Sequence, residues 1–233
     1  TCRDWSSDVC SSDLRANILY KNPELIPAMK EAGLIAMQFG IESVNKKILK
    51  LYKKLITPEQ VEFSIKKCVE EDIFQIVVSF ILGGPYESRE TIEENLAFAK
   101  KLIRMAPGRI RILNGYLSHL PGTPLGDEPD KYGLIPVEPL LKTGSAGGRE
   151  YFSETSNLKL WELVELKLKF DEEVVETMKE MFPYIPGTQM EKLFSMPSEG
   201  LSSIWFFLLN SNLALKRYFN FKKQTIYKTL NEL

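Results

Sequence analysis

Two short polar segments, each at the end of an apolar run, carry the residues of this sequence that could do chemistry. The first is Phe39–Ser43 and the second is Ile81–Glu87, and each combines glycine with a carboxylate. A carboxylate beside open backbone can accept hydrogen bonds from hydroxyl or ammonium groups. In parallel sheets, ligands bind at the carboxyl ends of the strands. The sequence therefore predicts one functional edge of a sheet, built from both segments.

Glu42 is the first candidate for ligand binding. Side chains alternate between the two faces of a strand, so Gln38, Gly40 and Glu42 share one face, and Phe39 and Ile41 share the other. If the polar set faces a barrel lumen, Glu42 lies at its open end and can accept hydrogen bonds from ribose hydroxyls or an ammonium group. Taken alone, however, Glu42 fits a strand-end cap or salt bridge better than a ligand contact.

The second segment and a nearby histidine are weaker candidates. Gly83 and Gly84 carry no Cβ, and a turn there would expose backbone N–H groups to a ligand, although an ordinary tight turn has the same composition. His119, the one histidine of the sequence, follows an apolar run and is more often structural than catalytic in such a setting.

The elements that must position these residues alternate between strands and helices. Apolar runs predict strands at 35–41, 75–82 and 110–117, and Arg15–Leu19 resembles the end of an earlier strand. Helix starts are indicated by Asn22-Pro23-Glu24, by the capping box Thr57–Gln60 and by Ser88. Strands about 35 to 40 residues apart with a helix in each gap are typical of an α/β barrel or an open parallel sheet.

Downstream of Pro124 the pattern changes. Residues 125–157 are rich in Gly and Pro and predict a loop or linker. We expect residues 158–233 to form a mainly helical C-terminal region, with helical periodicity at 158–181 and further helices at 201–230. In the helix after Thr57, Cys68 shares one apolar face with Val61 and Ile65, so we expect it in the core.

The first fourteen residues differ from the rest. Residues 1–14 show no periodicity and repeat Ser-Ser-Asp, and Asp4–Leu14 can be encoded by DNA that resembles a common sequencing adapter. We therefore expect 1–14 to be a non-native scar and the native gene to begin upstream. Without them, 30 basic and 31 acidic residues become 29 and 28, because Arg3, Asp4, Asp8 and Asp13 drop out.

This composition excludes several classes of protein. A nearly neutral chain suggests neither nucleic acid nor an anionic membrane as partner. Outside the expected scar, Cys68 is the one cysteine, which is too few for a disulfide framework or a metal cage and favours a reducing cytoplasm. The longest apolar run, 204–209, is much shorter than the roughly 20 residues that span a bilayer.

The order of the motifs is more specific than any one of them. From Arg15 to Pro124 the chain resembles the second half of the core of radical S-adenosylmethionine enzymes, in the branch with cobalamin-binding members and methylthiotransferases. The matching pieces are Arg15–Asn17, Asn22–Leu25, Ala32-Gly33, Gly40–Ser43, Lys53 or Lys54 before Thr57-Pro58-Glu59, Ile81–Glu87 and Pro121–Pro124. Tyr86 departs from the family pattern, which often has glycine there.

The resemblance implies the C-terminal half of a partial (β/α)6 TIM-like barrel at 15–124, in an enzyme that binds a [4Fe–4S] cluster and S-adenosylmethionine and generates a 5′-deoxyadenosyl radical. Cobalamin-dependent methyl or related transfer is one outcome within that branch. The implied cofactor-binding residues are Arg15, Gln38, Gly40, Glu42, Ser43, Ile81, Gly83 and Glu87. Of these, Glu42 and Ser43 would lie near the ribose or methionine, Ile81–Gly83 near the adenine, Arg15 near the methionine carboxylate, and Glu87 would order its loop.

No metal ligand is assigned, because the Cys-x-x-x-Cys-x-x-Cys motif of the family does not occur in this sequence. We therefore expect a fragment that is inactive by itself, with an unidentified substrate. Two alternatives stay open at this point. One is a phosphate-binding α/β barrel with Glu42 as acid or base and Gly83-Gly84 as anion cradle, and the other is a non-enzymatic interaction module.

Overall fold

A computed structural model describes residues 10–137, 152–181 and 184–186. The helices and strands follow in this order: β1 (Cys10–Asp13), α1 (Ala16–Lys21), α2 (Leu25–Glu31), β2 (Leu34–Glu42), α3 (Lys46–Leu51), α4 (Pro58–Glu70), β3 (Gln75–Leu82), α5 (Arg89–Met105), β4 (Ile110–Tyr116), α6 (Pro124–Asp127), the 3₁₀ turn η1 (Pro129–Tyr132), β5 (Leu134–Val137), β6 (Phe152–Thr155) and α7 (Leu160–Met181).

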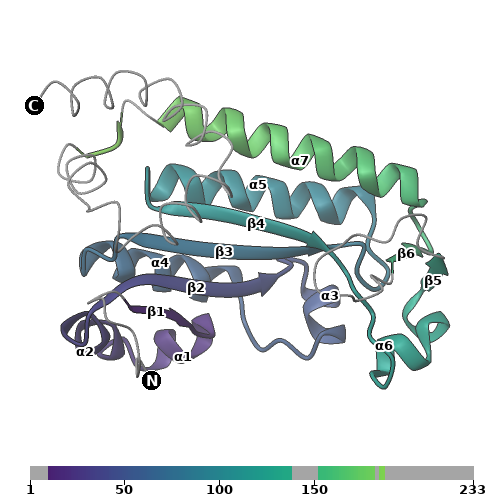
Figure 1. Ribbon diagram of the computed structural model, residues 1–233, viewed down its shortest axis with the longest axis horizontal. Coiled ribbons are helices and arrows are strands. Elements are labelled where there is room, and N and C mark those ends of the chain that lie inside the picture. Colours follow the sequence, from purple (N-terminus) through teal and green to yellow (C-terminus); the bar gives the residue numbers. More distant parts are fainter. Residues whose placement is uncertain (1–9, 138–151, 182–183, 187–233) are drawn as a thin grey trace, which may run out of the picture.

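Four parallel strands form the main sheet, in the order β1-β2-β3-β4. Parallel neighbours need crossover connections, which here contain helices. The arrowheads of β2, β3 and β4 point toward the end of the molecule where α3, α6 and the β5–β6 pair lie (Figure 1). The predicted α/β fold with a parallel sheet and a helical region after it is thus confirmed.

Helices α4 and α5 begin where the sequence predicts capping, whereas α2 begins at Leu25, after the predicted Asn22-Pro23 start and with no side-chain cap. The Thr57 N–H donates to Gln60 Oε1 at 3.1 Å and the Gln60 N–H donates to Thr57 Oγ1 at 3.4 Å, which completes the capping box of α4. At α5, the Ser88 N–H donates to Thr91 Oγ1 at 3.0 Å. These local bonds fix the direction in which each helix leaves the end of the loop before it.

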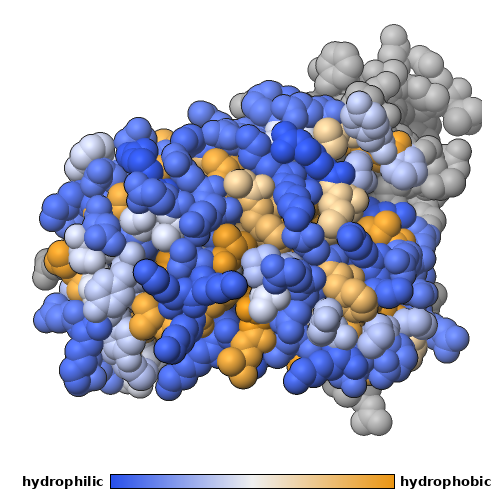
Figure 2. Space-filling view, turned by 180° about the vertical axis from the view of Figure 1, so that it is seen from behind, coloured by the Kyte–Doolittle hydropathy of each residue, from blue (hydrophilic) through white to orange (hydrophobic). Residues whose placement is uncertain are grey.

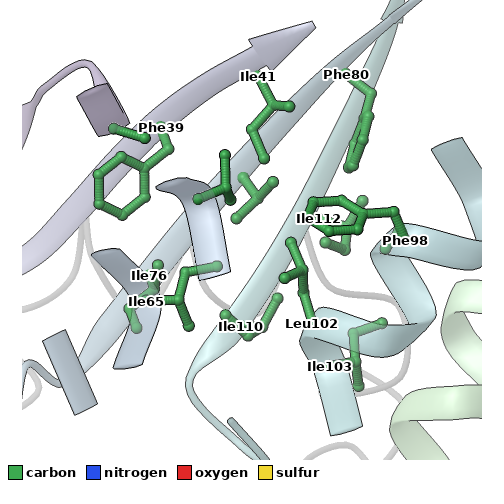
Figure 3. Close-up of a cluster of buried hydrophobic side chains, with 14 of the residues drawn as sticks. Phe39, Ile41, Ile65, Ile76, Phe80, Phe98, Leu102, Ile103, Ile110 and Ile112 are labelled. Atoms are coloured by element: carbon green, nitrogen blue, oxygen red, sulfur yellow. The ribbon is translucent and has the colours of Figure 1, made fainter. Parts of the chain in front are cut away.

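The core lies between one face of the sheet and the helices α4 and α5. Side chains from all of these elements converge there, as Figure 3 shows for Phe39, Ile41, Ile65, Ile76, Phe80, Phe98, Leu102, Ile103, Ile110 and Ile112. The face turned away from the view of Figure 1 is mostly hydrophilic with hydrophobic side chains scattered over it (Figure 2). Cys68 is fully buried, as predicted, and burial raises the pKa of its thiol to about 12.

Helix α7 adds a further layer alongside α5 (Figure 1). Phe170 is buried against Phe80, with ring centroids 5.8 Å apart, a contact that adds about 1 kcal/mol to simple burial. Ion pairs of Lys100 with Glu173 at 2.7 Å and of Lys169 with Glu93 at 3.0 Å join the outer surfaces. The helix predicted at 158–181 is confirmed as α7.

The structure differs from the sequence prediction near the N-terminus. Arg15–Leu19 is not the end of a strand: the strand is Cys10–Asp13, and Ala16 opens α1. Ala16 and Leu19, three residues apart, are both buried, and the Ser64 hydroxyl of α4 donates to the Ala16 carbonyl at 3.1 Å. The sequence did not reveal the helix because the run of residues 15–19 is too short to distinguish helical from strand spacing. Strand β1 falls within residues 1–14, whose non-native origin stays a prediction.

A second difference concerns residues 125–157, which are not a plain loop in their described part. Thr123 Oγ1 accepts a hydrogen bond from the Gly126 N–H at 3.2 Å at the start of α6, and Gly133, at φ +63°, turns the chain into β5. Strand β5 pairs antiparallel with β6. Because this pairing joins segments that are distant in sequence, local Gly and Pro content could not predict it. The helices expected at 201–230 lie outside the described residues.

Candidate functional site

The two polar segments meet at one edge of the sheet. Gly40 of β2 is in register with Ser79 of β3, which is in register with Leu113 of β4, and Ile81 is next to Gly115. Since all strands run parallel, the Phe39–Ser43 and Ile81–Glu87 segments leave the sheet at the same end. The predicted shared edge therefore exists.

The predicted alternation along β2 is confirmed. Phe39 and Ile41 are buried in the helix-covered core, whereas Gln38, Gly40 and Glu42 are half-buried on the opposite face. On β4, Arg111 lies on the same face as Gln38, because both are in register with Val77 of β3. Arg111 is 4% exposed, and burial lowers the pKa of its guanidinium to about 10. Sequence reasoning missed it, although an arginine inside an apolar run was a usable signal.

Glu42 sits at the end of β2 in a constrained backbone conformation. The pairing with β3 shifts register between Gly40 and Glu42, and Glu42 has φ +67°, which is uncommon for a residue with a side chain. A Cβ on Gly40 would lie 2.8 Å from Glu42 Oε1, so glycine leaves room for the carboxylate over the strand. Backbone strain of this kind gathers at functional sites, which favours a functional reading of Glu42.

Lys54 is the cation that faces Glu42. Its Nζ lies 2.8 Å from Glu42 Oε1 and donates to the Gly40 carbonyl at 3.3 Å. The Glu42 and Lys54 side chains are 16% and 23% exposed, so neither is sealed from solvent. The salt bridge that was the simpler interpretation of Glu42 is therefore present. Its exposure leaves both charges accessible to a zwitterionic ligand.

Ser43, which the resemblance places near the ribose or methionine part of the ligand, directly follows β2. It is fully buried, and its hydroxyl donates to Asn95 Oδ1 at 3.2 Å and accepts from the Asn45 N–H at 3.1 Å. The same Asn95 Oδ1 accepts from the Val44 N–H at 2.8 Å. Ser43 thus holds the strand end against α5 and keeps its hydroxyl bonds within the protein.

Glu87 lies under the second segment and is fully buried. Its Oε2 accepts the N–H groups of Gly83 at 2.5 Å and Gly84 at 3.1 Å, and its Oε1 accepts from Asn95 Nδ2 at 3.4 Å. Burial raises the pKa of the Glu87 carboxyl to about 7, against the opposing effect of the two backbone donors. These bonds confirm that Glu87 orders its loop.

The same bonds change the interpretation of the two glycines. The Gly83 and Gly84 N–H groups, expected to face a ligand, are both taken by Glu87. A cradle for phosphate needs free backbone donors, so this arrangement speaks against the phosphate-binding alternative. Gly83 has φ +75° and Gly84 lies against Tyr52, where a Cβ would be 2.1 Å from the Tyr52 hydroxyl oxygen. Tyr86, where the family often has glycine, also has a positive φ, of 55°.

The segment around β6 fastens this loop from outside. Thr155 Oγ1 donates to the Glu87 carbonyl at 2.8 Å, and Asn157 Nδ2 donates to the Tyr86 carbonyl at 2.9 Å. His119 is buried, and its Nδ1 lies 3.1 Å from Ser153 Oγ, which joins the exit of β4 to β6. Burial lowers the pKa of His119, so the ring is neutral near pH 7. This placement favours the structural interpretation of His119.

Arg15 directly follows β1, which pairs parallel with β2, so it leaves the sheet at the same end as the two polar segments, and its side chain is exposed. Among the described residues, no group of three or more His, Cys, Asp or Glu side chains could hold a metal ion. Cys68 is buried in the core. The residues described here therefore do not fit an iron–sulfur cluster, which needs several converging cysteine thiolates.

The fold is an α/β domain with polar residues at the carboxyl ends of its parallel strands, and comparison with known proteins narrows the class of protein. Residues 7–99 match the family described as the Radical SAM superfamily, over less than half of the chain. An uncharacterized methyltransferase of Pyrococcus horikoshii is 41% identical over 81 residues, which is 35% of this chain and 17% of that protein. The oxygen-independent coproporphyrinogen III oxidase of Synechocystis sp. is 27% identical over 131 residues, 55% and 27% of the two chains.

The fold is shared with a solved structure of a larger protein. The coproporphyrinogen III oxidase of Escherichia coli, described as a radical SAM enzyme, superposes with a TM-score of 0.51 at 13% identity, over 72% of this chain and 32% of that one. The radical S-adenosylmethionine methyltransferase TsrM of Kitasatospora setae gives 0.42 at 20% identity, over 60% and 26%. The chain spans about a third or less of each of these proteins. The sequence matches support a radical SAM enzyme, and the likeness to the Escherichia coli protein shows the shared fold.

Proposed function

We propose that this chain is part of a radical S-adenosylmethionine enzyme and binds S-adenosylmethionine at the carboxyl edge of β2 and β3. The observation that carries the proposal is the Glu42–Lys54 pair, which is partly exposed above Gly40 at the strand end. The match of residues 7–99 to the Radical SAM superfamily supports it.

The chemistry of the pair suits a zwitterionic nucleoside. Lys54 can attract the carboxylate of the methionine part, and Glu42 can accept hydrogen bonds from ribose hydroxyls or from the ammonium group. Ile81, half-buried two residues before Gly83, offers an apolar side chain for the adenine. The bonds of Glu87 hold the loop behind Ile81 in one conformation, so little ordering has to accompany binding.

In radical SAM enzymes, S-adenosylmethionine supplies a 5′-deoxyadenosyl radical once it is reductively cleaved. Because the described residues do not fit an iron–sulfur cluster, the proposal for this chain is limited to binding. For the whole protein we propose transfer of a methyl or related group, since the relative from Pyrococcus horikoshii is named a methyltransferase. Cobalamin as a second cofactor, a cytoplasmic location and a substrate other than nucleic acid also stay predictions. None of the described helices is long and apolar enough to cross a membrane.

Isothermal titration calorimetry of the purified chain with S-adenosylmethionine tests the binding proposal. We expect saturable binding that weakens at high salt, because both partners contribute charges that salt screens. Lys54→Met serves as the matched variant, since it keeps the length of the side chain and removes its charge. Absence of binding, or equal affinity in Lys54→Met, would contradict the proposed site.

The expected inactivity of the isolated chain has its own test. After anaerobic incubation with iron and sulfide, we expect no stable visible absorbance from a thiolate-bound cluster and no 5′-deoxyadenosine. The physical reason is that Cys68 is buried and its thiol has a pKa of about 12, so it is a poor ligand. A stable cluster together with 5′-deoxyadenosine production would show that this expectation is wrong.

A further inference from the structure

The hydroxyl group of Tyr52 has no assigned role and an unusual position. Tyr52 follows α3 directly, and its hydroxyl oxygen packs against the loop after β3, where a Cβ on Gly84 would lie only 2.1 Å away. The oxygen is buried and, within the part of the chain that the structure describes, it has no hydrogen-bond partner. A buried hydroxyl without a partner destabilises a fold, so such groups call for an explanation.

The surroundings of this hydroxyl keep it protonated. Burial, the Glu87 carboxylate and the Glu42 carboxylate, in that order, raise the pKa of Tyr52 far above its usual value. The group is therefore a neutral hydrogen-bond donor at any physiological pH. Both Glu87 oxygens already accept bonds, from Gly83, Gly84 and Asn95, and Glu42 Oε1 is 2.8 Å from Lys54. Among the described residues no group accepts a hydrogen bond from Tyr52, so its donor is left over at the junction of the two strand ends.

We propose that the Tyr52 hydroxyl is a ligand-binding group that donates a hydrogen bond to a neutral oxygen of the nucleoside part of the bound S-adenosylmethionine. This inference rests on the proposed function of the same site. A neutral acceptor such as a ribose oxygen fits, because the carboxylates of Glu42 and Glu87 repel an anionic one. The bond to the ligand requires no internal hydrogen bond to break first.

This role separates the effect of Tyr52 on stability from its effect on binding. Tyr52→Phe removes one oxygen and keeps the ring that packs against Gly84. In the free protein, loss of an unpartnered buried hydroxyl leaves the melting temperature equal or higher. In the complex, loss of the donor weakens binding. A hydroxyl with a structural role gives the opposite result in both measurements.

The experiment compares wild type, Tyr52→Phe and the control Tyr20→Phe, whose ring lies on α1 against Phe63 and away from the site. Calorimetry with S-adenosylmethionine gives the dissociation constant, and thermal denaturation without ligand gives the melting temperature. We expect Tyr52→Phe to raise the dissociation constant about tenfold, in line with one lost hydrogen bond, without lowering the melting temperature. Tyr20→Phe should leave both values unchanged.

Fragments of the ligand locate the contact. Adenosine as the probe should keep the dependence on Tyr52, and methionine should not. If wild type binds and Tyr52→Phe binds equally well, this inference is overturned while the proposed function stands. A lower melting temperature with unchanged affinity makes the hydroxyl structural and also overturns it. If wild type fails to bind S-adenosylmethionine, both the proposed function and this inference are wrong.

Discussion

The ends of β2 and β3 look alike in sequence and differ in use. Each strand end has a glycine and a glutamate nearby. Glu42 is partly exposed and paired with Lys54, whereas Glu87 is buried and bonded to the backbone of Gly83 and Gly84. One carboxylate is available to a ligand and the other shapes the loop beside it. Asn95 joins the two regions, since it bonds Ser43 and Val44 on one side and Glu87 on the other. Burial, and not residue type, separates a binding carboxylate from a structural one.

The strongest way to break this comparison is Glu87→Ala. It leaves the buried Gly83 and Gly84 N–H groups without an acceptor, so we expect the free energy of unfolding to fall by about 3 kcal/mol. Urea denaturation measures the change. Glu42→Ala is the matched control, with an expected loss below about 1 kcal/mol because its ion pair is partly exposed. Equal losses in the two variants would contradict the division of roles.

The second prediction concerns ligand affinity, for which Glu42 should matter more than Glu87. Glu42→Ala removes a charged acceptor at the open edge, so we expect S-adenosylmethionine to bind more weakly by about 1.5 to 3 kcal/mol, or at least about tenfold. Calorimetry of the folded variant gives the affinity. Unchanged affinity with an intact fold would rule out a ligand contact by Glu42.

The third prediction follows from the pKa of Glu87, which burial raises from the ordinary 4.5 of a glutamate to about 7 in the folded protein. Between these values the folded state binds more protons than the unfolded state, so stability falls as the pH rises through this range. Glu87 lowers the free energy of unfolding by at most about 1.4 kcal/mol for each pH unit of this rise. We expect the difference in unfolding free energy between wild type and Glu87→Gln to show this decline. A difference that stays flat between those pH values would contradict the raised pKa.

The smallest effects should come from the glycines. Gly83→Ala places a side chain at φ +75° and should cost about 1 to 2 kcal/mol of stability. Gly40 has no positive φ, but a Cβ there meets Glu42 Oε1 at 2.8 Å. Gly40→Ala should therefore displace the carboxylate and weaken ligand binding, with little change in stability. If both variants changed stability, or both changed ligand binding, this division between the two glycines would be wrong.

Much of the scaffold followed from local pattern. The strands β2, β3 and β4, the capping box of α4 and the helical spacing of Cys68 depend on period and capping chemistry, which act over a few residues. The pairing of β5 with β6 and the helix at Ala16–Lys21 did not follow, because one needs distant partners and the other is too short to show a period. Lys54 appeared in the sequence only as one of two adjacent lysines.

The sequence by itself determined that glycine and a carboxylate stand at the ends of two parallel strands, because strand period and helix caps are local properties. Only the tertiary structure decided what each group does. Packing of α5 and β6 around the second loop desolvates Glu87, which accepts the backbone N–H groups of Gly83 and Gly84. The hydroxyl of Tyr52, packed against the same loop, has no partner among the described residues. The loop before α4 brings Lys54 to Glu42 at the edge that stays partly exposed. Desolvation depends on what packs around a group, and that is settled only when distant segments meet.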